Sequence, residues 1–369
     1  MTSVNKDLSL EDGTTMKWFS KNHDYFLNKT CIIYGRTQSG KSTIIDEIMF
    51  LLKNYIPVPF VICQSSVTIT SSPYFGKIPN NCIKSGVTKE WLETFMDNQK
   101  GRAAIYKTAN DFKTLKIVFN KIKQDDSIKA EESIKQHACK YIDAITSNIK
   151  LDFGQKREQI SNINNIQITH LTNLYKKSIR RNKLILENND SLTVDEKCCV
   201  KYLDFNPCIM IIFDDCASQF RKWTKESTSI KEMFYNGRHY YITQIITAQD
   251  DKEIDSELRK NALVSIFTTQ QASIANFERK SNNYSKAEIK KAELCSRRVF
   301  STTDSSSKNY KKLVYLQNGE LNPFCYTIAS IQEDFRIGCD TLWEMDQKMV
   351  SMQKNDTTNN AFFNRFFDT

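Results

Sequence analysis

The chain has 369 residues, which is enough for one large domain or two of ordinary size. Hydrophobic residues make up 40% of it and charged residues 26%, as in soluble globular proteins, so wholesale disorder is excluded. The longest apolar run, residues 208–213, is far too short to cross a bilayer, and the first residues lack the apolar stretch of a signal peptide. We therefore expect neither an ordinary membrane protein nor a secreted one.

Positive charge is in excess, because 52 Lys and Arg stand against 43 Asp and Glu and give a net charge of +9. This balance favours a polyanionic partner but does not establish one. Eleven cysteines occur without any C-x-x-C spacing, and most lie in apolar runs where cysteine acts as a small buried hydrophobe. We expect reduced thiols in an intracellular protein, and the four His leave little scope for a histidine-rich metal site.

The chain is predicted to begin with a polar N-terminal arm, residues 1–28, and then to alternate strand and helix. Residues 30–34 have the pattern of a buried strand, and residues 43–52 place apolar side chains at helical spacing. Residues 59–63 have the pattern of a second buried strand. This β-α-β beginning predicts an α/β core.

Residues 88–204 are predicted to form a mainly helical, basic insertion into that core. Apolar residues recur at steps of three and four as far as residue 185, and Lys and Arg fill the gaps between them. The most basic stretch is residues 175–183. A charge run of this kind is ordinarily a solvated helix face.

Strand patterns return in the last part of the chain. The predicted strands are residues 208–213, 241–247, 263–267, 312–316 and 324–328. Asn318-Gly319, between the last two, is a strong hairpin signal. The core is therefore assigned to residues 29–87 and 205–335, and residues 336–369 are predicted to be a C-terminal helix followed by an aromatic tail.

The segment from Gly35 to Ser42 matches the phosphate-binding pattern G-x-x-x-x-G-K-[ST] between a buried strand and a helix. Glycines let backbone amides turn around an anion, and the helix N-terminus adds partial positive charge. Lys41 would reach the β- and γ-phosphates, and the Ser42 hydroxyl would bind Mg²⁺. The predicted nucleotide-binding residues are Gly35, Arg36, Thr37, Gln38, Ser39, Gly40, Lys41, Ser42 and Thr43.

Acidic and amide side chains follow two of the later strands. Asp214 and Asp215 come directly after residues 208–213, as in a Walker B strand, where the first carboxylate holds Mg²⁺ and the second orients or deprotonates water. The alternative role for this pair is to cap the next helix. Gln249 follows the next strand and is suited to sensing the γ-phosphate or positioning water.

Two arginines lie just before predicted strands. Arg238 precedes residues 241–247, and Arg259 precedes residues 263–267. An arginine at a subunit boundary can stabilise charge on the γ-phosphate bound by a neighbouring subunit. Either arginine could equally form a surface salt bridge.

Together these segments resemble the genome-packaging ATPases of large DNA viruses, the poxvirus-type members of the HerA/FtsK superfamily. The resemblance is carried by Gly35–Ser42, Phe213-Asp214-Asp215, Asn236-Gly237-Arg238-His239-Tyr240, Gln249 and Leu258-Arg259-Lys260-Asn261. It covers residues 28–85 and 205–270, and its most specific part is Gly-Arg-His before a strand that ends in Gln. The spacing implies an additional strand between the Walker A and Walker B strands, which marks the RecA-like class with a mainly parallel sheet.

The resemblance implies a ring-forming ATPase, pentameric or hexameric, that uses ATP and Mg²⁺ to drive double-stranded DNA into a preformed capsid. The P-loop residues, Asp214 and Gln249 carry over directly. Asp215 departs from the pattern, because many members have Glu there and Asp is one methylene shorter. A capsid or portal component is an implied partner, and the implied location is the virion or the host cytoplasm, with the nucleus also open.

Two further hypotheses concern the basic stretch of the insertion and the apolar tail. Basic side chains of the insertion would contact DNA phosphates: Lys176, Lys177, Arg180 and Arg181. The apolar tail side chains would dock on a neighbouring subunit or on the capsid, or else pack on their own domain: Phe362, Phe363, Phe366 and Phe367.

Several other classes of P-loop protein remain to be distinguished from such a motor. A GTPase would need N-K-x-D, and Asn120-Lys121-Ile122-Lys123 lacks the Asp. No Gly-rich signature helix of an ABC ATPase precedes the Walker B strand, and the C-terminal carboxylates are too few for a terminase nuclease. A helicase, a nucleotide kinase and a poorly hydrolysing ATP-binding assembly factor stay open.

Overall fold

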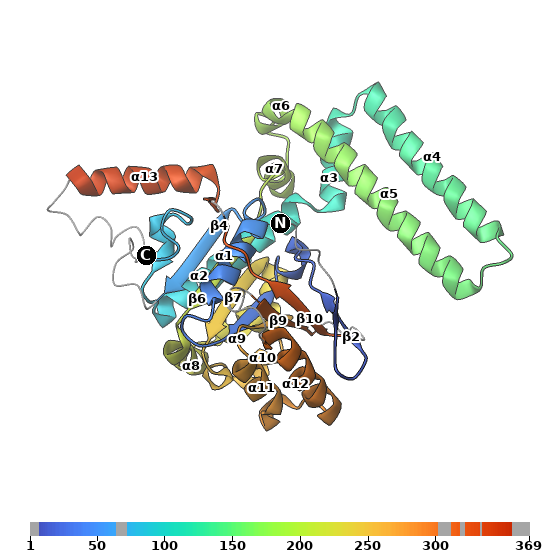
Figure 1. Cartoon of the computed structure of the whole chain (residues 1–369). Coiled ribbons are helices and arrows are strands. Elements are labelled where there is room, and N and C mark those ends of the chain that lie inside the picture. Colours follow the sequence, from blue (N-terminus) through green and yellow to red (C-terminus); the bar gives the residue numbers. More distant parts are fainter. Residues whose placement is uncertain (1–6, 64–71, 302–310, 318–321, 333, 356–369) are drawn as a thin grey trace. The chain divides into compact units, whose positions relative to one another are not determined.

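The structure is a computed structural model that describes residues 7–63, 72–301, 311–317, 322–332 and 334–355. It divides into two compact units (Figure 1). Unit 1 combines residues 1–100 with residues 207–369, and unit 2 is residues 101–206. A functional division into arm, core, insertion and tail stays a prediction.

Unit 1 is built on one sheet of ten strands within the described residues, in the order β1-β2-β10-β9-β8-β3-β7-β6-β4-β5. The strands are β1 (Leu8–Ser9), β2 (Thr15–Trp18), β3 (Thr30–Tyr34), β4 (Val58–Cys63), β5 (Ile83–Lys84), β6 (Ile209–Asp214), β7 (Ile242–Ala248), β8 (Val264–Phe267), β9 (Lys311–Leu316) and β10 (Phe324–Ile328). From β8 to β5 all neighbours are parallel. β7 lies between β3 and β6, so the expected additional strand between the Walker strands is confirmed.

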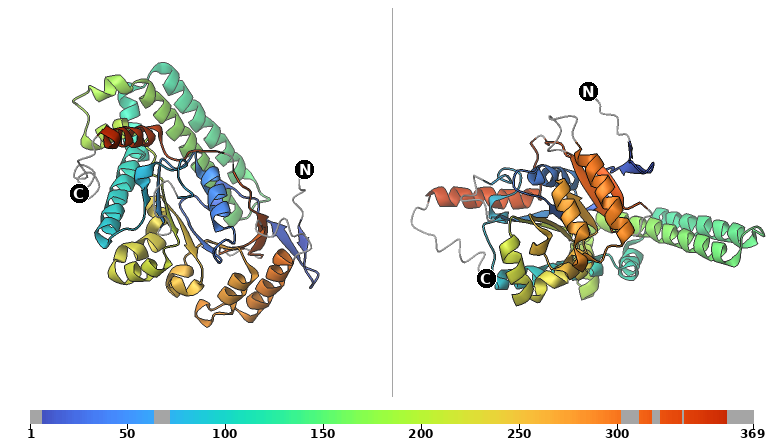
Figure 2. Two further views of the ribbon diagram at one scale, coloured as in Figure 1. Left: turned by 60° about the vertical axis from the view of Figure 1, so that its left-hand side comes forward. Right: turned by 60° about the horizontal axis from the view of Figure 1, so that its bottom comes forward.

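Helices cover both faces of this sheet, which explains why its central strands are apolar throughout (Figure 2). In β3, Ile32 and Tyr34 pack on one face, whereas Cys31 and Ile33 pack on the other. The helices of unit 1 are α1 (Lys41–Leu52), α8 (Ala217–Glu226), α9 (Thr228–Asn236), α10 (Ser256–Arg259), α11 (Gln270–Glu278), α12 (Lys286–Phe300) and α13 (Asp340–Asn355). Short 3₁₀ turns join them: η1 (His23–Tyr25), η3 (Asn80–Cys82), η4 (Gly237–Tyr240), η5 (Asp251–Glu253) and η6 (Lys280–Asn282).

The C-terminal hairpin is confirmed, because β9 and β10 pair antiparallel. β9 also pairs antiparallel with β8, which extends the sheet beyond the parallel core. The expected turn residues Asn318-Gly319 lie outside the described residues, as does the Phe-rich tail after residue 355.

Part of the expected N-terminal arm belongs to the sheet. β2 pairs parallel with β10, with Lys17 opposite Cys325 and Trp18 opposite Tyr326. Met16 is buried in the core, and the Trp18 ring meets the Tyr326 ring edge-on. Four residues are too short for a clear alternating pattern, which is why the sequence alone predicted only an arm here.

Unit 2 is helical, as the sequence predicted for this region. Its helices are α3 (Phe112–Ile122), α4 (Asp125–Ser147), α5 (Phe153–Arg181), α6 (Lys183–Glu187) and α7 (Val194–Lys201), and α2 (Lys89–Ala109) runs across the boundary of the two units. Its core gathers apolar side chains from α3, α5, α6 and α7, with Phe119 and Tyr175 in ring contact at its centre. α4 and α5 form a long antiparallel hairpin (Figure 1).

Two chemical expectations can be compared with the structure. Each of the eleven cysteines is a free thiol. Across the described part of the chain, no helix is both long and apolar enough to cross a membrane.

Candidate functional site

The loop between β3 and α1 has the backbone of an anion cradle. Gln38 and Gly40 have φ values of 61° and 83°, and left-handed residues of this kind turn neighbouring amides toward one side. α1 begins at Lys41, so the positive end of its dipole faces the same space. Position 35 accepts only glycine, because a Cβ there would lie 1.7 Å from the Thr268 Oγ1 atom.

Lys41 is folded over this loop. Its Nζ donates to the carbonyl oxygen of Gly35 at 2.8 Å and to that of Arg36 at 3.0 Å. Burial lowers the pKa of Lys41, while the negative charges of Asp214 and Asp215 act in the opposite direction. The ammonium therefore lies within electrostatic reach of both carboxylates that follow β6.

The remaining residues predicted at the nucleotide lie on the loop or on the first turn of α1. Arg36, Thr37, Gln38 and Ser42 are exposed, Gly40 and Thr43 are half-buried, and Gly35 and Ser39 are buried. The loop thus combines exposed residues, which a ligand in solvent can reach, with the buried residues Gly35 and Ser39, which anchor it to the sheet.

Asp214 ends β6 and is held by two hydroxyl groups. Thr247 Oγ1 donates to Asp214 Oδ1 at 2.9 Å, and Tyr74 Oη donates to Asp214 Oδ2 at 2.8 Å. Asp214 is 8% exposed and Tyr74 2% exposed. Burial, with the Asp214 charge adding to it, raises the pKa of Tyr74 well above its usual value, so the phenol stays a donor. The carboxylate is thereby fixed in one orientation.

Asp215 and Gln249 meet at the same edge of the sheet. Gln249 Nε2 donates to Asp215 Oδ1 at 3.0 Å, and the Asp215 amide donates to Thr247 Oγ1 at 2.9 Å. Asp215 has φ 54°, a conformation that Asp tolerates better than most residues and that turns its carboxylate outward into solvent. The backbone N–H of Gln249 donates to Glu253 Oε2 at 2.8 Å. Burial raises the pKa of the Glu253 carboxyl.

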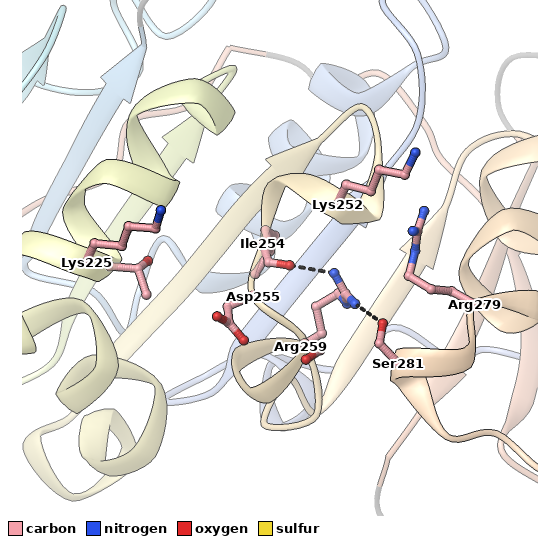
Figure 3. A pocket seen from close by; sticks show the side chains of 9 residues that line it. Lys225, Lys252, Ile254, Asp255, Arg259, Arg279 and Ser281 are labelled. Atoms are coloured by element: carbon pink, nitrogen blue, oxygen red, sulfur yellow. Dashed lines mark hydrogen bonds between the residues drawn. The ribbon is translucent and has the colours of Figure 1, made fainter.

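The two arginines have different surroundings. Arg259 is 7% exposed, and its guanidinium donates to the carbonyl oxygen of Ile254 at 2.5 Å (Figure 3). It also donates to Asn282 Oδ1 at 2.7 and 3.0 Å. It lies in the wall of a pocket of about 450 Å³ together with Lys225, Lys252 and Arg279. Its guanidinium thus braces its own chain, which is not the geometry of a group that reaches a neighbour. Arg238 is exposed on η4, before the first residue of β7.

The basic residues of unit 2 cluster at the end of α5. Arg180 forms a two-pronged ion pair with Asp204, and Lys176 is half-buried, whereas Lys177 and Arg181 are exposed. Cations in the last turn of a helix also complement its dipole. Contact of these residues with DNA stays a prediction.

Sequence reasoning missed five residues that contact this site: Tyr74, Thr247, Glu253, Thr268 and Lys312. Lys312 does so through its Nζ, which donates to the carbonyl oxygen of Ser39. Only Lys312 left a signal, since the alternation of its strand places it on the same face as Val314 and Leu316, which are buried. Tyr74, Thr247 and Thr268 are ordinary polar residues whose proximity to the site depends on the packing of segments distant in the sequence. Glu253 lies on η5, four residues after Gln249.

The fold and this edge of the sheet define a P-loop NTPase with an additional strand between its Walker A and Walker B strands. The chain belongs to the zonular occludens toxin (Zot) family, whose model matches residues 118–316. The matched range includes Asp214, Asp215 and Gln249, and the Gly35–Ser42 loop precedes it.

One relative and two solved structures extend these comparisons. An uncharacterized protein of African swine fever virus (isolate Pig/Kenya/KEN-50/1950), B354L, is 29% identical over 362 residues, covering 93% of this chain and 94% of the relative. The genome packaging NTPase B204 from Sulfolobus turreted icosahedral virus 2 aligns at 12% identity and TM-score 0.36, over 83% of this chain and 98% of that one. The pCW3 conjugation coupling protein TcpA aligns at 12% identity and TM-score 0.36, over 94% and 70%. The family match and the viral relative agree with the resemblance to viral P-loop ATPases. The function is argued below from the site, the net charge and the sequence motifs.

The environments of the two arginines predict effects of different size on the free energy of unfolding. Arg259→Met should lower the free energy of unfolding by about 3 kcal/mol, because several buried acceptors lose a charged donor. Arg238→Met should change it by less than about 0.5 kcal/mol, because the side chain is exposed. Urea unfolding of the two variants checks this, and equal losses would contradict the structural role of Arg259.

Proposed function

We propose that the protein is an ATP-hydrolysing motor that translocates double-stranded viral DNA into a preformed capsid as a homo-oligomeric ring. The observation that carries the ATPase part is the convergence at one sheet edge of Lys41, Asp214 and the Asp215–Gln249 pair. The DNA part rests on the net charge of +9 and on the resemblance of the sequence to packaging ATPases.

The residues present fit Mg²⁺ bound with a nucleotide. Mg²⁺ prefers oxygen ligands, keeps several waters, and is commonly held by one or two carboxylates together with substrate phosphates. Ser42 offers an exposed hydroxyl on the loop, and Asp214 offers an oriented carboxylate at the end of β6. When bound, Mg²⁺ would neutralise charge on the β- and γ-phosphate oxygens.

In the proposed reaction, the chain supplies three functions. Backbone amides of the loop and Lys41 bind the phosphates and stabilise the charge that develops on them. Asp215 accepts a proton from, or orients, the attacking water, and such a base contributes about 10²- to 10⁴-fold in rate. The side-chain amide of Gln249 donates to the Asp215 carboxylate and so fixes its orientation.

A ring is favoured by the position of Arg238. β7 has seven residues, so its two ends lie roughly 20 Å apart, and Arg238 lies at the end opposite its own phosphate loop. An arginine there cannot reach the γ-phosphate of its own subunit, but it can serve a neighbour. Arg238 is therefore our proposed trans-acting arginine.

A poorly hydrolysing ATP-binding assembly factor is the second candidate. It is favoured by Asp215, whose shorter side chain stands where the resemblance leads one to expect Glu. Assembly in the host cytoplasm or in the virion, with a capsid or portal partner, fits either function.

Steady-state ATP hydrolysis of the full chain, with and without double-stranded DNA, tests the proposal. We expect turnover that DNA stimulates and that Lys41→Ala abolishes, with Lys53→Ala, just beyond the other end of α1, as the control that retains it. Turnover that ignores DNA would contradict the translocating motor and favour a kinase-like enzyme. ATP binding without turnover would instead support the assembly factor.

Thr247 predicts a specific change in metal dependence. Thr247→Val removes the hydroxyl that orients Asp214, so half-maximal hydrolysis should need about tenfold more Mg²⁺, as for other residues that orient metal ligands. Thr243→Val is the matched control, since its buried hydroxyl on the same strand accepts from the Asn28 amide at the opposite end of β7. A Mg²⁺ titration in which both variants shift equally would show that Asp214 is not the metal-side carboxylate.

A further inference from the structure

Lys312 is a fully buried lysine in the core of unit 1. It is 0% exposed and lies on β9. Its side chain is on the same face of the strand as Val314 and Leu316, which pack in the apolar core. Placing an ammonium in such surroundings costs free energy, and burial lowers the pKa of Lys312 to about 8. A lysine kept at this position therefore needs a reason other than packing.

The Lys312 ammonium reaches the phosphate loop from inside the protein. Its Nζ donates to the carbonyl oxygen of Ser39 at 3.2 Å. β9 pairs antiparallel with β8, where Phe267 lies opposite Leu313, and the continuation of that register places Lys312 opposite Thr268. Two neighbouring strands thus present a side chain each to the same loop.

Thr268 holds the adjoining atoms of this loop. Its Oγ1 lies 2.5 Å from Ser39 Oγ and donates to the carbonyl oxygen of Tyr34 at 3.1 Å. The same atom occupies the space where a side chain at Gly35 would be. The beginning of the loop and its residue Ser39 are therefore fixed against β8 and β9.

The planarity of the peptide bond connects this buried contact to the nucleotide. In a trans peptide, the N–H of Gly40 points opposite to the C=O of Ser39. When Lys312 draws the Ser39 carbonyl toward the core, the Gly40 amide is turned toward the outer side, where the loop would surround a phosphate.

We propose that Lys312 is a positioning residue of the nucleotide site, which together with Thr268 holds the Ser39–Gly40 peptide in its phosphate-binding orientation. This inference rests on the proposed function, because it assigns a role at the same site. Lys41 acts from the outer side of the loop, where it binds phosphate. Lys312 acts from the core side, where it positions the Ser39–Gly40 peptide.

Lys312→Met tests this role, because methionine keeps the length and removes the charge. We measure the affinity of the full chain for a fluorescent, non-hydrolysable ATP analogue with Mg²⁺, and the Tm of each variant in the absence of nucleotide. The affinity should fall about tenfold, as for loss of one charged hydrogen bond at a binding site. The Tm should be unchanged or higher, since a buried charge has been replaced by an apolar group.

Three further variants complete the design. Lys311→Met is the matched control on the preceding, half-buried position and should bind the analogue as the wild type does. Lys312→Arg should recover part of the affinity, because it restores a donor. Thr268→Val should weaken binding without changing the charge, and it provides a second test should Lys312→Met fold poorly.

The outcomes separate this inference from the proposed function. Wild-type affinity in Lys312→Met overturns the positioning role while leaving the ATPase intact. The same holds for a parallel loss of Tm and affinity in Lys312→Met that Lys312→Arg does not relieve, if Thr268→Val binds the analogue as the wild type does. Failure of the wild-type chain to bind the analogue contradicts both.

Discussion

At the start of the phosphate loop there is room for a hydrogen atom but not for a methyl group. Thr268 Oγ1 occupies the place where a Cβ of residue 35 would be, so the loop lies directly on the end of β8. This close approach lets the Thr268 and Ser39 hydroxyls meet and brings Ser39 within reach of Lys312. The loop that would receive a nucleotide is therefore shaped by strands that lie more than 200 residues further along the chain.

The second constraint is the insertion of β7 between β3 and β6. Parallel strands end at the same edge of a sheet, so Thr247, near the end of β7, lies beside the end of β6. Its hydroxyl donates to the Asp214 carboxylate and accepts from the Asp215 backbone N–H. The next polar side chain, Gln249, then reaches Asp215. β7 thus orients both Asp214, the proposed metal-side carboxylate, and Asp215, which is proposed to act on water. Arg238 precedes the opposite end of β7, far from the phosphate loop of its own subunit.

Much of this architecture could be predicted from the sequence, because the central strands are continuous apolar runs and the Gly35–Ser42 pattern is specific. The positions of the predicted strands, the additional strand, the hairpin and the helical unit agree with the structure, whereas the short strands β1, β2 and β5 were not predicted. Contacts between segments distant in the sequence could not be predicted, so Thr268 and Tyr74 were missed although they touch the site. Burial could not be predicted either. The sequence position of Arg259 before a strand resembles that of a trans-acting arginine, whereas its guanidinium is buried and hydrogen-bonded within its own chain.

The central claim is that a nucleoside triphosphate binds over the Gly35–Ser42 loop. Isothermal titration of the full chain with a non-hydrolysable ATP analogue and Mg²⁺ tests it most directly, because it needs neither DNA nor capsid. We predict one bound nucleotide per chain, lost in Lys41→Ala and retained in Arg238→Ala under conditions where the chain is monomeric. Equal binding by wild type and Lys41→Ala, or no binding by the wild type, would contradict the account.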